Sequence, residues 1–226
     1  AQMGAYYTKE DITEYIGRNT ILPFLMDATK KTTANAFKTN GSVWQYLKES
    51  GDRYIYDAVK HGHETPIPDY IAEGIDTTKP NLLERRSRWN ERTPEPWNLP
   101  TEIWRETVAR RERYAETKRK IESGEVKSIN DFITLNLDIT SFTQDYLSQT
   151  TDSDFVKRFY GALKEISILD PTCGSGAFLF AALNILEPLY EICIDRLDEV
   201  QKEIKDKYRS NIQYFIYKNI NISSIV

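Results

Sequence analysis

Apolar residues along the chain recur mainly at intervals of three and four, which is the spacing of one face of an α-helix. Residues 101–123 place charges opposite an apolar stripe and stop at Gly124, which predicts a long amphipathic helix. Alternation of period two, typical of half-buried strands, is rare. The pattern predicts a mainly helical region over residues 1–165. Its two clearest stripes consist of Trp104, Val108, Tyr114 and Ile121, and of Phe155, Phe159, Leu163 and Ile166.

Capping residues predict where the helices begin. The first helix is expected to carry Ile12, Tyr15 and Ile16, with a second helical segment following it. A short strand or hairpin arm is possible around residues 54–56, and prolines from 66 to 100 indicate an irregular connection. The expected helix starts are at Thr8 with Asp11, Thr20 with Pro23, Ser42, Thr101, Ser128, and Asp152 or Ser153.

The pattern changes near residue 165, where a brief β-compatible run, residues 167–170, leads into a glycine turn. Gly174 and Gly176 are expected to need positive φ, and a helix is expected to resume at Ala177. A strand, a glycine turn and a helix in this order create a crevice at the carboxyl end of the strand. We therefore predict a division at this point, with residues 166–226 beginning an α/β domain.

The spacing of the glycine turn excludes two common ligands. A dinucleotide fingerprint needs a third glycine where this chain has Leu179. A phosphate-binding P-loop needs a lysine that residues 179–181, Leu-Phe-Ala, do not supply. The free amides at the start of the helix suit a carboxylate or a phosphate group of some other ligand.

The turn Asp170–Phe178, DPTCGSGAF, resembles motif I of the S-adenosylmethionine-dependent DNA adenine methyltransferases, and differs from its usual form only at Thr172. The segment GAYYTKEDITEYI resembles motif X of the same enzymes, with Lys9 where proline is more usual. Motif X precedes motif I, as in the adenine-N6 enzymes. The residues between them are similar to the helical N-terminal part of large methylases of restriction-modification and phage-exclusion systems.

The resemblance implies a Rossmann-like methyltransferase domain that binds S-adenosylmethionine. Asp170 would accept a hydrogen bond from the ammonium group of the methionine moiety, and the amides of residues 172–174 would frame the same end. Thr8, with Tyr7, would close the pocket, while Phe178 would support its wall. The implied cofactor-binding residues are Tyr7, Thr8, Asp170, Pro171, Thr172, Cys173, Gly174, Gly176 and Phe178.

The activity implied is methyl transfer to adenine N6 in double-stranded DNA, by direct attack of the flipped base on the sulfonium methyl. The family's Asn/Asp-Pro-Pro-Tyr/Phe motif is absent from these 226 residues, as is an acid to hold the ribose. We therefore expect the chain to be the N-terminal part of a longer enzyme, inactive alone, with no catalytic residue of its own. An incomplete sheet would leave an apolar face uncovered and favour self-association.

Composition limits the class of protein and the cellular compartment that the sequence predicts. The net charge of −4 shows no overall basic excess, and the apolar content of 40% can build a sizeable core. The two cysteines fit reduced core thiols, and the N-terminus lacks the pattern of a signal peptide. Polar residues and a proline interrupt the longest apolar stretch, so no membrane span is expected. A cytoplasmic protein is predicted.

The cysteine, histidine and basic residues of the sequence each have more than one interpretation. Cys173 is better explained by packing than as a nucleophile, and His61 with His63 by a loop than by a metal site. The basic residues of 105–120 suit DNA phosphates, but interleaved glutamates are typical of a solvated helix face; residues 84–92 are a similar candidate. Two alternatives to a DNA methylase remain, namely a helical DNA-binding or protein-interaction module and a protein-glutamine methyltransferase.

Overall fold

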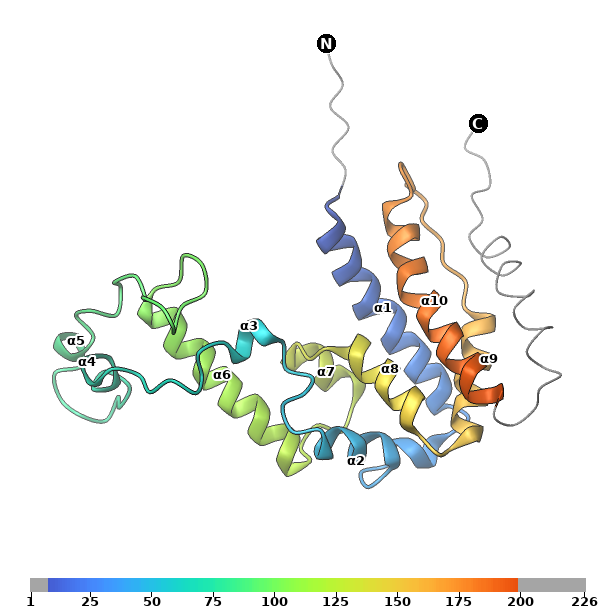
Figure 1. The fold of residues 1–226 in the computed structure, drawn as a ribbon, viewed down its shortest axis with the longest axis horizontal. Coiled ribbons are helices and arrows are strands. Elements are labelled where there is room, and N and C mark those ends of the chain that lie inside the picture. The colour runs from blue at the N-terminus through green and yellow to red at the C-terminus, as the bar shows by residue number, and fades with distance from the viewer. Residues whose placement is uncertain (1–7, 199–226) are drawn as a thin grey trace, which may run out of the picture. The chain divides into compact units, whose positions relative to one another are not determined.

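The computed structural model describes residues 8–198, and over that range the chain is mainly helical (Figure 1). The elements, in chain order, are α1 (Glu10–Lys30), the 3₁₀ helix η1 (Ala34–Phe37), α2 (Ser42–Glu49), α3 (Asp57–Lys60), α4 (Asp69–Ala72), α5 (Leu82–Arg85), α6 (Trp104–Ser123), α7 (Ile129–Leu135), α8 (Ile139–Gln149), α9 (Ser153–Glu165) and α10 (Ala177–Asp198).

The chain divides into two compact units. The first unit contains the described residues 8–47, 126–134 and 138–198, and the second contains residues 48–125 and 135–137. The first unit is therefore assembled from segments far apart in the sequence, whereas the second is almost one continuous stretch. The expected division at residue 165 falls inside the first unit, where α9 packs against α10. It stays a prediction about where a cofactor-binding domain begins.

The first unit is a bundle in which α1, α8, α9 and α10 share one apolar core. Each fully buried side chain of leucine or phenylalanine size stabilises such a core by about 1.5–3 kcal/mol. The Tyr190 hydroxyl in α10 donates to the carbonyl oxygen of Leu163 at 2.6 Å, so this buried polar group is satisfied across the α9–α10 contact. The innermost residues are Leu22, Leu25, Met26, Phe142, Leu147, Phe155, Phe159, Leu163, Leu189 and Cys193.

Helices α1 and α10 lie side by side and parallel, with both N-termini at the same end of the bundle (Figure 1). The connection over residues 166–176 returns the chain to that end after α9 (Figure 1). Gly17 allows the close approach, because a Cβ built there would lie 2.9 Å from Cδ1 of Ile185. Residues 8–16, the described part of the segment that resembles motif X, and the turn that resembles motif I are thereby brought to one end of one unit.

Two of the predicted helix starts have the expected side-chain caps. Ser128 Oγ accepts from Asp131 N at 3.2 Å, while Asp131 Oδ2 accepts from Ser128 N at 2.9 Å, which is a reciprocal capping box. Asp152 Oδ1 accepts from Phe155 N at 3.0 Å at the start of α9. Both caps join residues three positions apart, so the sequence alone was sufficient to predict them.

Three other starts differ from the prediction. Lys9, not Thr8, is the N-cap of α1, and no side chain caps that end. The two expected segments form one helix through Pro23, because burial of both halves against the bundle outweighs the one backbone hydrogen bond that proline removes. Helix α6 begins at Trp104 after Ile103, whose amide donates to Glu106 Oε2 at 3.1 Å, so Thr101 does not cap it.

The expected strands are not present among residues 8–198, which contain one isolated bridge between Arg92 and Ile103. Residues 167–170 are irregular, and Leu169 is 86% exposed, because no neighbouring strand in the described residues offers backbone partners. Residues 51–55 form turns in place of a strand. The mainly helical prediction is confirmed, while the Rossmann-like part is not observed among the described residues.

The long apolar helix α10 is sufficient in length and composition to cross a membrane. Half of its most apolar window is buried against other helices of the same unit, as in the core helix of a bundle. Packing within the unit thus accounts for the buried half of this apolar window.

The second unit is organised around buried Arg110 on α6. The guanidinium pairs with Glu102, with Nε at 2.8 Å from Oε1 and Nη2 at 2.9 Å from Oε2. It also donates to the carbonyl oxygens of His61, at 2.5 Å, and Trp97, at 2.7 Å. Burial opposes ionisation of Glu102, but hydrogen bonds from Arg110, Leu99 and Thr107 prevail and lower the pKa of its carboxyl. One side chain thus holds two loops against α6.

Replacing Arg110 by methionine should destabilise the second unit by about 3–5 kcal/mol, since the Glu102 charge and several carbonyls lose their partner. Adding Glu102→Gln should recover part of the loss, because no unpaired buried charge remains. Urea unfolding followed by tryptophan fluorescence tests this, as Trp89, Trp97 and Trp104 all lie in this unit. Arg119→Met is the control: this exposed arginine pairs only with surface glutamates, and its loss should cost under about 1 kcal/mol.

The Tyr114 hydroxyl donates to Asp52 Oδ2 at 2.6 Å, and this bond is the main cause that lowers the pKa of Asp52. The pKa of the Asp52 carboxyl is lower in the folded protein than in the unfolded chain, where it is about 3.9. The ionised carboxylate therefore stabilises the folded protein above that pH, and this stabilisation is lost as the pH falls through the folded-state pKa. Tyr114→Phe, which retains the ring that stacks on His63, should therefore cost about 1 kcal/mol at pH 7. The difference between the two proteins in chemical unfolding should shrink below pH 4; a constant difference would contradict this account.

Candidate functional site

The glycine turn has the backbone conformation that its sequence predicts. Gly174 and Gly176 have φ of +52° and +81°, a region that side chains disfavour. Asp170 Oδ1 accepts from Thr172 N at 2.9 Å, and Gly176 N donates to Cys173 O at 2.7 Å, so the turn closes on itself. The prediction of positive φ at both glycines is confirmed.

Helix α10 begins at Ala177, as predicted, directly after this turn. At the start of the helix, Phe180 N donates to Gly176 O at 2.9 Å. The amides ahead of Phe180 belong to the first helical turn, where backbone donors lack intrahelical acceptors and carry partial positive charge. This end of α10 can therefore bind a carboxylate or another anionic group through its backbone amides.

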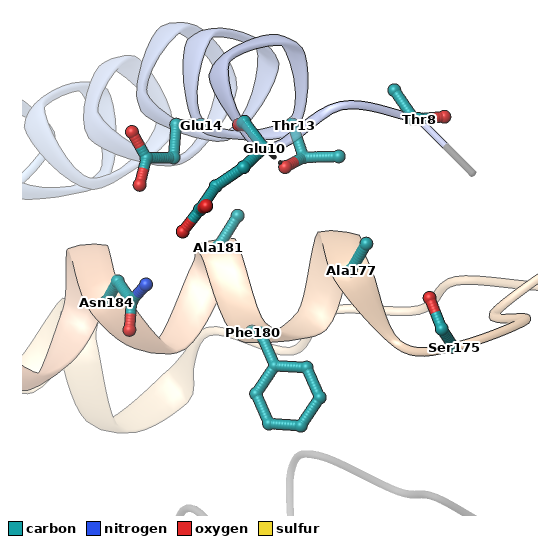
Figure 2. Close-up of a pocket in the computed structure, with 9 residues that line it drawn as sticks. All are labelled: Thr8, Glu10, Thr13, Glu14, Ser175, Ala177, Phe180, Ala181 and Asn184. Atoms are coloured by element: carbon teal, nitrogen blue, oxygen red, sulfur yellow. Dashed lines mark hydrogen bonds between the residues drawn. The ribbon is translucent and has the colours of Figure 1, made fainter.

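A hollow of about 270 Å³ lies between the first turns of α1 and α10 (Figure 2). Figure 2 shows the Glu10 side chain extending from α1 toward α10, with Ala177 and Ala181 opposite. The small alanine side chains leave the space that larger residues would fill. The lining residues are Thr8, Glu10, Thr13, Glu14, Ser175, Ala177, Phe180, Ala181 and Asn184.

The hollow joins the two segments singled out in the sequence, through Thr8 on one side and Ser175 on the other. Asp170 and its turn neighbours adjoin this end of α10 but do not line the hollow, and half-buried Phe178 does not line it either. Tyr7 lies outside the described residues. The adjoining residues expected at the cofactor are Asp170, Pro171, Thr172, Cys173, Gly174 and Gly176.

Sequence reasoning missed most of the side chains that line the hollow. On α1 they are Glu10, Thr13 and Glu14, at the three- and four-residue spacing of one helix face. On α10 the spacing of Ala177, Ala181 and Asn184 gives a matching stripe of small and polar residues within an otherwise apolar helix. That interruption of the apolar pattern was the available signal.

The charged residues that line the hollow are both acidic. Glu10 and Glu14 stand one helical turn apart, and within residues 8–198 no lysine or arginine lines the hollow. Neither carboxylate has a salt-bridge partner within residues 8–198. Thr13 Oγ1 donates to the backbone carbonyl of Glu10 at 2.9 Å and is already satisfied. The hollow therefore combines carboxylates on α1 with backbone donors on α10.

The two cysteines have different surroundings. Cys193 is fully buried in the bundle, and burial raises the pKa of its thiol, which suits packing and not nucleophilic chemistry. Cys173 lies half-buried in the glycine turn. Within the described part of the chain no three His, Cys, Asp or Glu residues gather in a metal-binding arrangement.

The histidine loop is held by arginine. Arg111 donates to the carbonyl oxygens of Gly62, His63 and Thr65 at 2.7–2.8 Å. The His63 ring packs on Tyr114 with centroids 4.4 Å apart. These contacts account for His63 structurally, within the second unit.

The basic run on α6 is largely occupied by partners inside the second unit. Arg110 and Arg111 bind loop carbonyls, as described, while Lys118 pairs with Glu122 and Arg119 with Glu116 and Glu125. In the segment 84–92, Arg88 pairs with Glu91, and Arg86 lies over the Trp89 ring at 4.1 Å. These pairings favour the structural interpretation of both segments over a phosphate-binding face.

Comparisons with protein-family models, curated proteins and solved structures found no match for this chain.

Gly17→Leu should destabilise the first unit by about 1–3 kcal/mol, because the new side chain collides with Ile185 and separates α1 from α10. Gly161→Leu on α9 is the matched control, since a Cβ there meets nothing within 4 Å and replacing a helical glycine favours the helix. Urea unfolding followed by circular dichroism measures both. Equal effects at the two positions would show that the α1–α10 approach does not depend on Gly17.

Proposed function

We propose that this chain forms the methionine end of the S-adenosylmethionine site in the N-terminal part of a site-specific DNA adenine-N6 methyltransferase. The observation that carries the proposal is the hollow, which Thr8 and Ser175 line together although they are far apart in the sequence. The turn DPTCGSGAF and the segment GAYYTKEDITEYI resemble the two motifs that meet at the cofactor in those enzymes.

The chemistry of the hollow fits the amino-acid end of that cofactor. Its carboxylate suits the backbone donors at the start of α10, and its ammonium group suits a carboxylate of Glu10 or Glu14 in the hollow, with Asp170 in the adjoining turn. A volume of about 270 Å³ lies below the range of about 300–1,000 Å³ typical of complete small-molecule sites. The hollow therefore suits one part of the cofactor, and binding by this chain alone should be weak.

S-adenosylmethionine, when bound, supplies a methyl group made electrophilic by its sulfonium. In the proposed reaction the adenine N6 amine forms the new N–C bond, the S–C bond breaks, and a proton leaves N6. The present residues would bind and orient the donor. They contain no Asn/Asp-Pro-Pro-Tyr/Phe motif, so we assign no catalytic residue among them.

The proposal includes a Rossmann-like domain that begins at residue 166, in the cytoplasm where DNA is modified. Exposed Leu169 supports it, because an apolar residue in an extended segment is what a strand presents before a neighbour covers it. The glycine turn and α10 already follow this segment in the required order.

A second candidate, a helical protein-interaction module with a structural glycine turn, is favoured by one observation. Helix α1 exposes Ile12, Tyr15 and Ile16 on one face, and Phe24 two turns further along. Such a stripe is typical of a surface that a partner covers. This candidate predicts no specific contact between the hollow and a methyl donor.

Binding of S-adenosylmethionine at millimolar concentrations should be detectable by protein-observed ¹H–¹⁵N NMR, as amide shifts in residues 172–184. Ser175→Phe should abolish it by filling the hollow, and Asp170→Ala should weaken it by opening the turn. Ser148→Phe, on an exposed position of α8, should bind as the parent does. Shifts that map away from the hollow, or none, would favour the interaction module.

Methyl transfer itself is tested in cells. The whole open reading frame that encodes this chain, expressed in a host lacking adenine methylation, should place N6-methyladenine at one sequence motif. The same frame with Gly174→Val and Gly176→Val should not, because both positions have positive φ. Unmethylated DNA from the parent frame would overturn the assignment to adenine.

A further inference from the structure

Helix α1 carries a row of exposed side chains along one side. Ile12, Ile16, Thr20 and Phe24 follow one another at four-residue intervals, the spacing that forms a ridge on a helix surface. Ile12, Ile16 and Phe24 are 46%, 42% and 56% exposed. The Thr20 hydroxyl donates to the carbonyl oxygen of Ile16 at 2.8 Å, so this polar group needs no water to be satisfied. The ridge, residues 12, 16, 20 and 24, therefore suits burial against another apolar surface.

The charges at the two ends of this ridge have opposite signs. Exposed Lys9 lies ahead of the ridge and exposed Asp27 lies beyond it, at equal distances along the helix from the midpoint of the ridge. A second α1 that runs antiparallel across this midpoint would bring Lys9 toward Asp27 of the partner subunit, and Asp27 toward the partner's Lys9. The same arrangement would bring Ile12 toward the partner's Phe24. The ridge is thus complementary to itself in charge as well as in apolar character.

We propose that the ridge docks a second copy of this chain, in a two-fold dimer held by an antiparallel contact between the two α1 helices. An unrelated apolar partner would not require opposite charges placed symmetrically about the ridge, whereas an antiparallel copy does. The proposal is independent of the proposed function, since the described residues that line the hollow include none of the ridge. A contact over one helix face buries less than a standard interface of about 1,600 Å², so the dimer should be weak.

Sedimentation velocity of the 226-residue chain at rising concentration should show a reversible monomer–dimer equilibrium at low salt. Lys9→Asp and Asp27→Lys, each alone, place like charges near one another at both ends of the contact, and each should raise the dimer Kd about tenfold. An equimolar mixture of the two variants should associate with about the parent's affinity, because a mixed dimer again has opposite charges at both ends. Both variants should fold, since aspartate suits an N-cap and lysine suits the last turn of a helix.

Ile16→Lys should also raise the Kd about tenfold or more, because it would bury a charge near the two-fold axis. Leu83→Lys replaces an exposed leucine of the second unit and should leave the Kd unchanged. A parent chain that stays monomeric at millimolar concentration, as expected if another segment of the chain or a different protein covers the ridge, would overturn the proposal. So would a dimer that Ile16→Lys leaves intact, or a mixture of the two charge variants that associates no better than either variant alone.

Discussion

The close parallel contact between α1 and α10 is the interaction on which the first unit and its candidate site depend. Two helices that run in the same direction place both N-termini at one end, and the approach at Gly17 and Ile185 sets how near those ends come. The small side chains Ala177 and Ala181 then leave a hollow at that end. A larger residue at any of these positions would either separate the helices or fill the space between them.

The two units use different physical means to hold their segments together. The first relies on an apolar core of aromatic and aliphatic side chains contributed by four helices. Apart from α6, the second has short helices and long connections. It has a small apolar cluster of Ile71, Trp89, Trp104 and Val108, and arginine side chains that bind loop carbonyls add to it. Arg110 and Arg111 do this from α6, and Arg85 does it within residues 73–85, where it binds the carbonyls of Glu73, Asp76, Lys79 and Pro80. Arginine suits this task because its planar donors can reach several acceptors at once.

The charges of the candidate site suit a ligand of mixed charge. Backbone donors at the start of α10 favour a negative group, while the carboxylates of Glu10 and Glu14 on α1 favour a positive one, and an α-amino acid moiety carries both. A phosphate ligand would meet the same backbone donors but also Glu10 and Glu14. The acidic lining therefore disfavours a phosphate ligand, as does the absence of a dinucleotide fingerprint or a P-loop from the sequence.

The sequence by itself determined the features that depend on neighbouring residues. Helical periodicity, the caps at Ser128 and Asp152, the positive φ of Gly174 and Gly176, and the start of α10 at Ala177 are all local, and each was predicted. Tertiary structure decided the rest. Burial carried α1 through Pro23 as one helix, and the lack of a neighbouring strand within residues 8–198 left residues 167–170 irregular. Internal pairing occupied Arg110, Arg111 and Arg119 of α6. Only packing placed Glu10 and Glu14 opposite Ala177 and Ala181, because contacts between residues more than 150 positions apart depend on how helices pack and leave no local pattern.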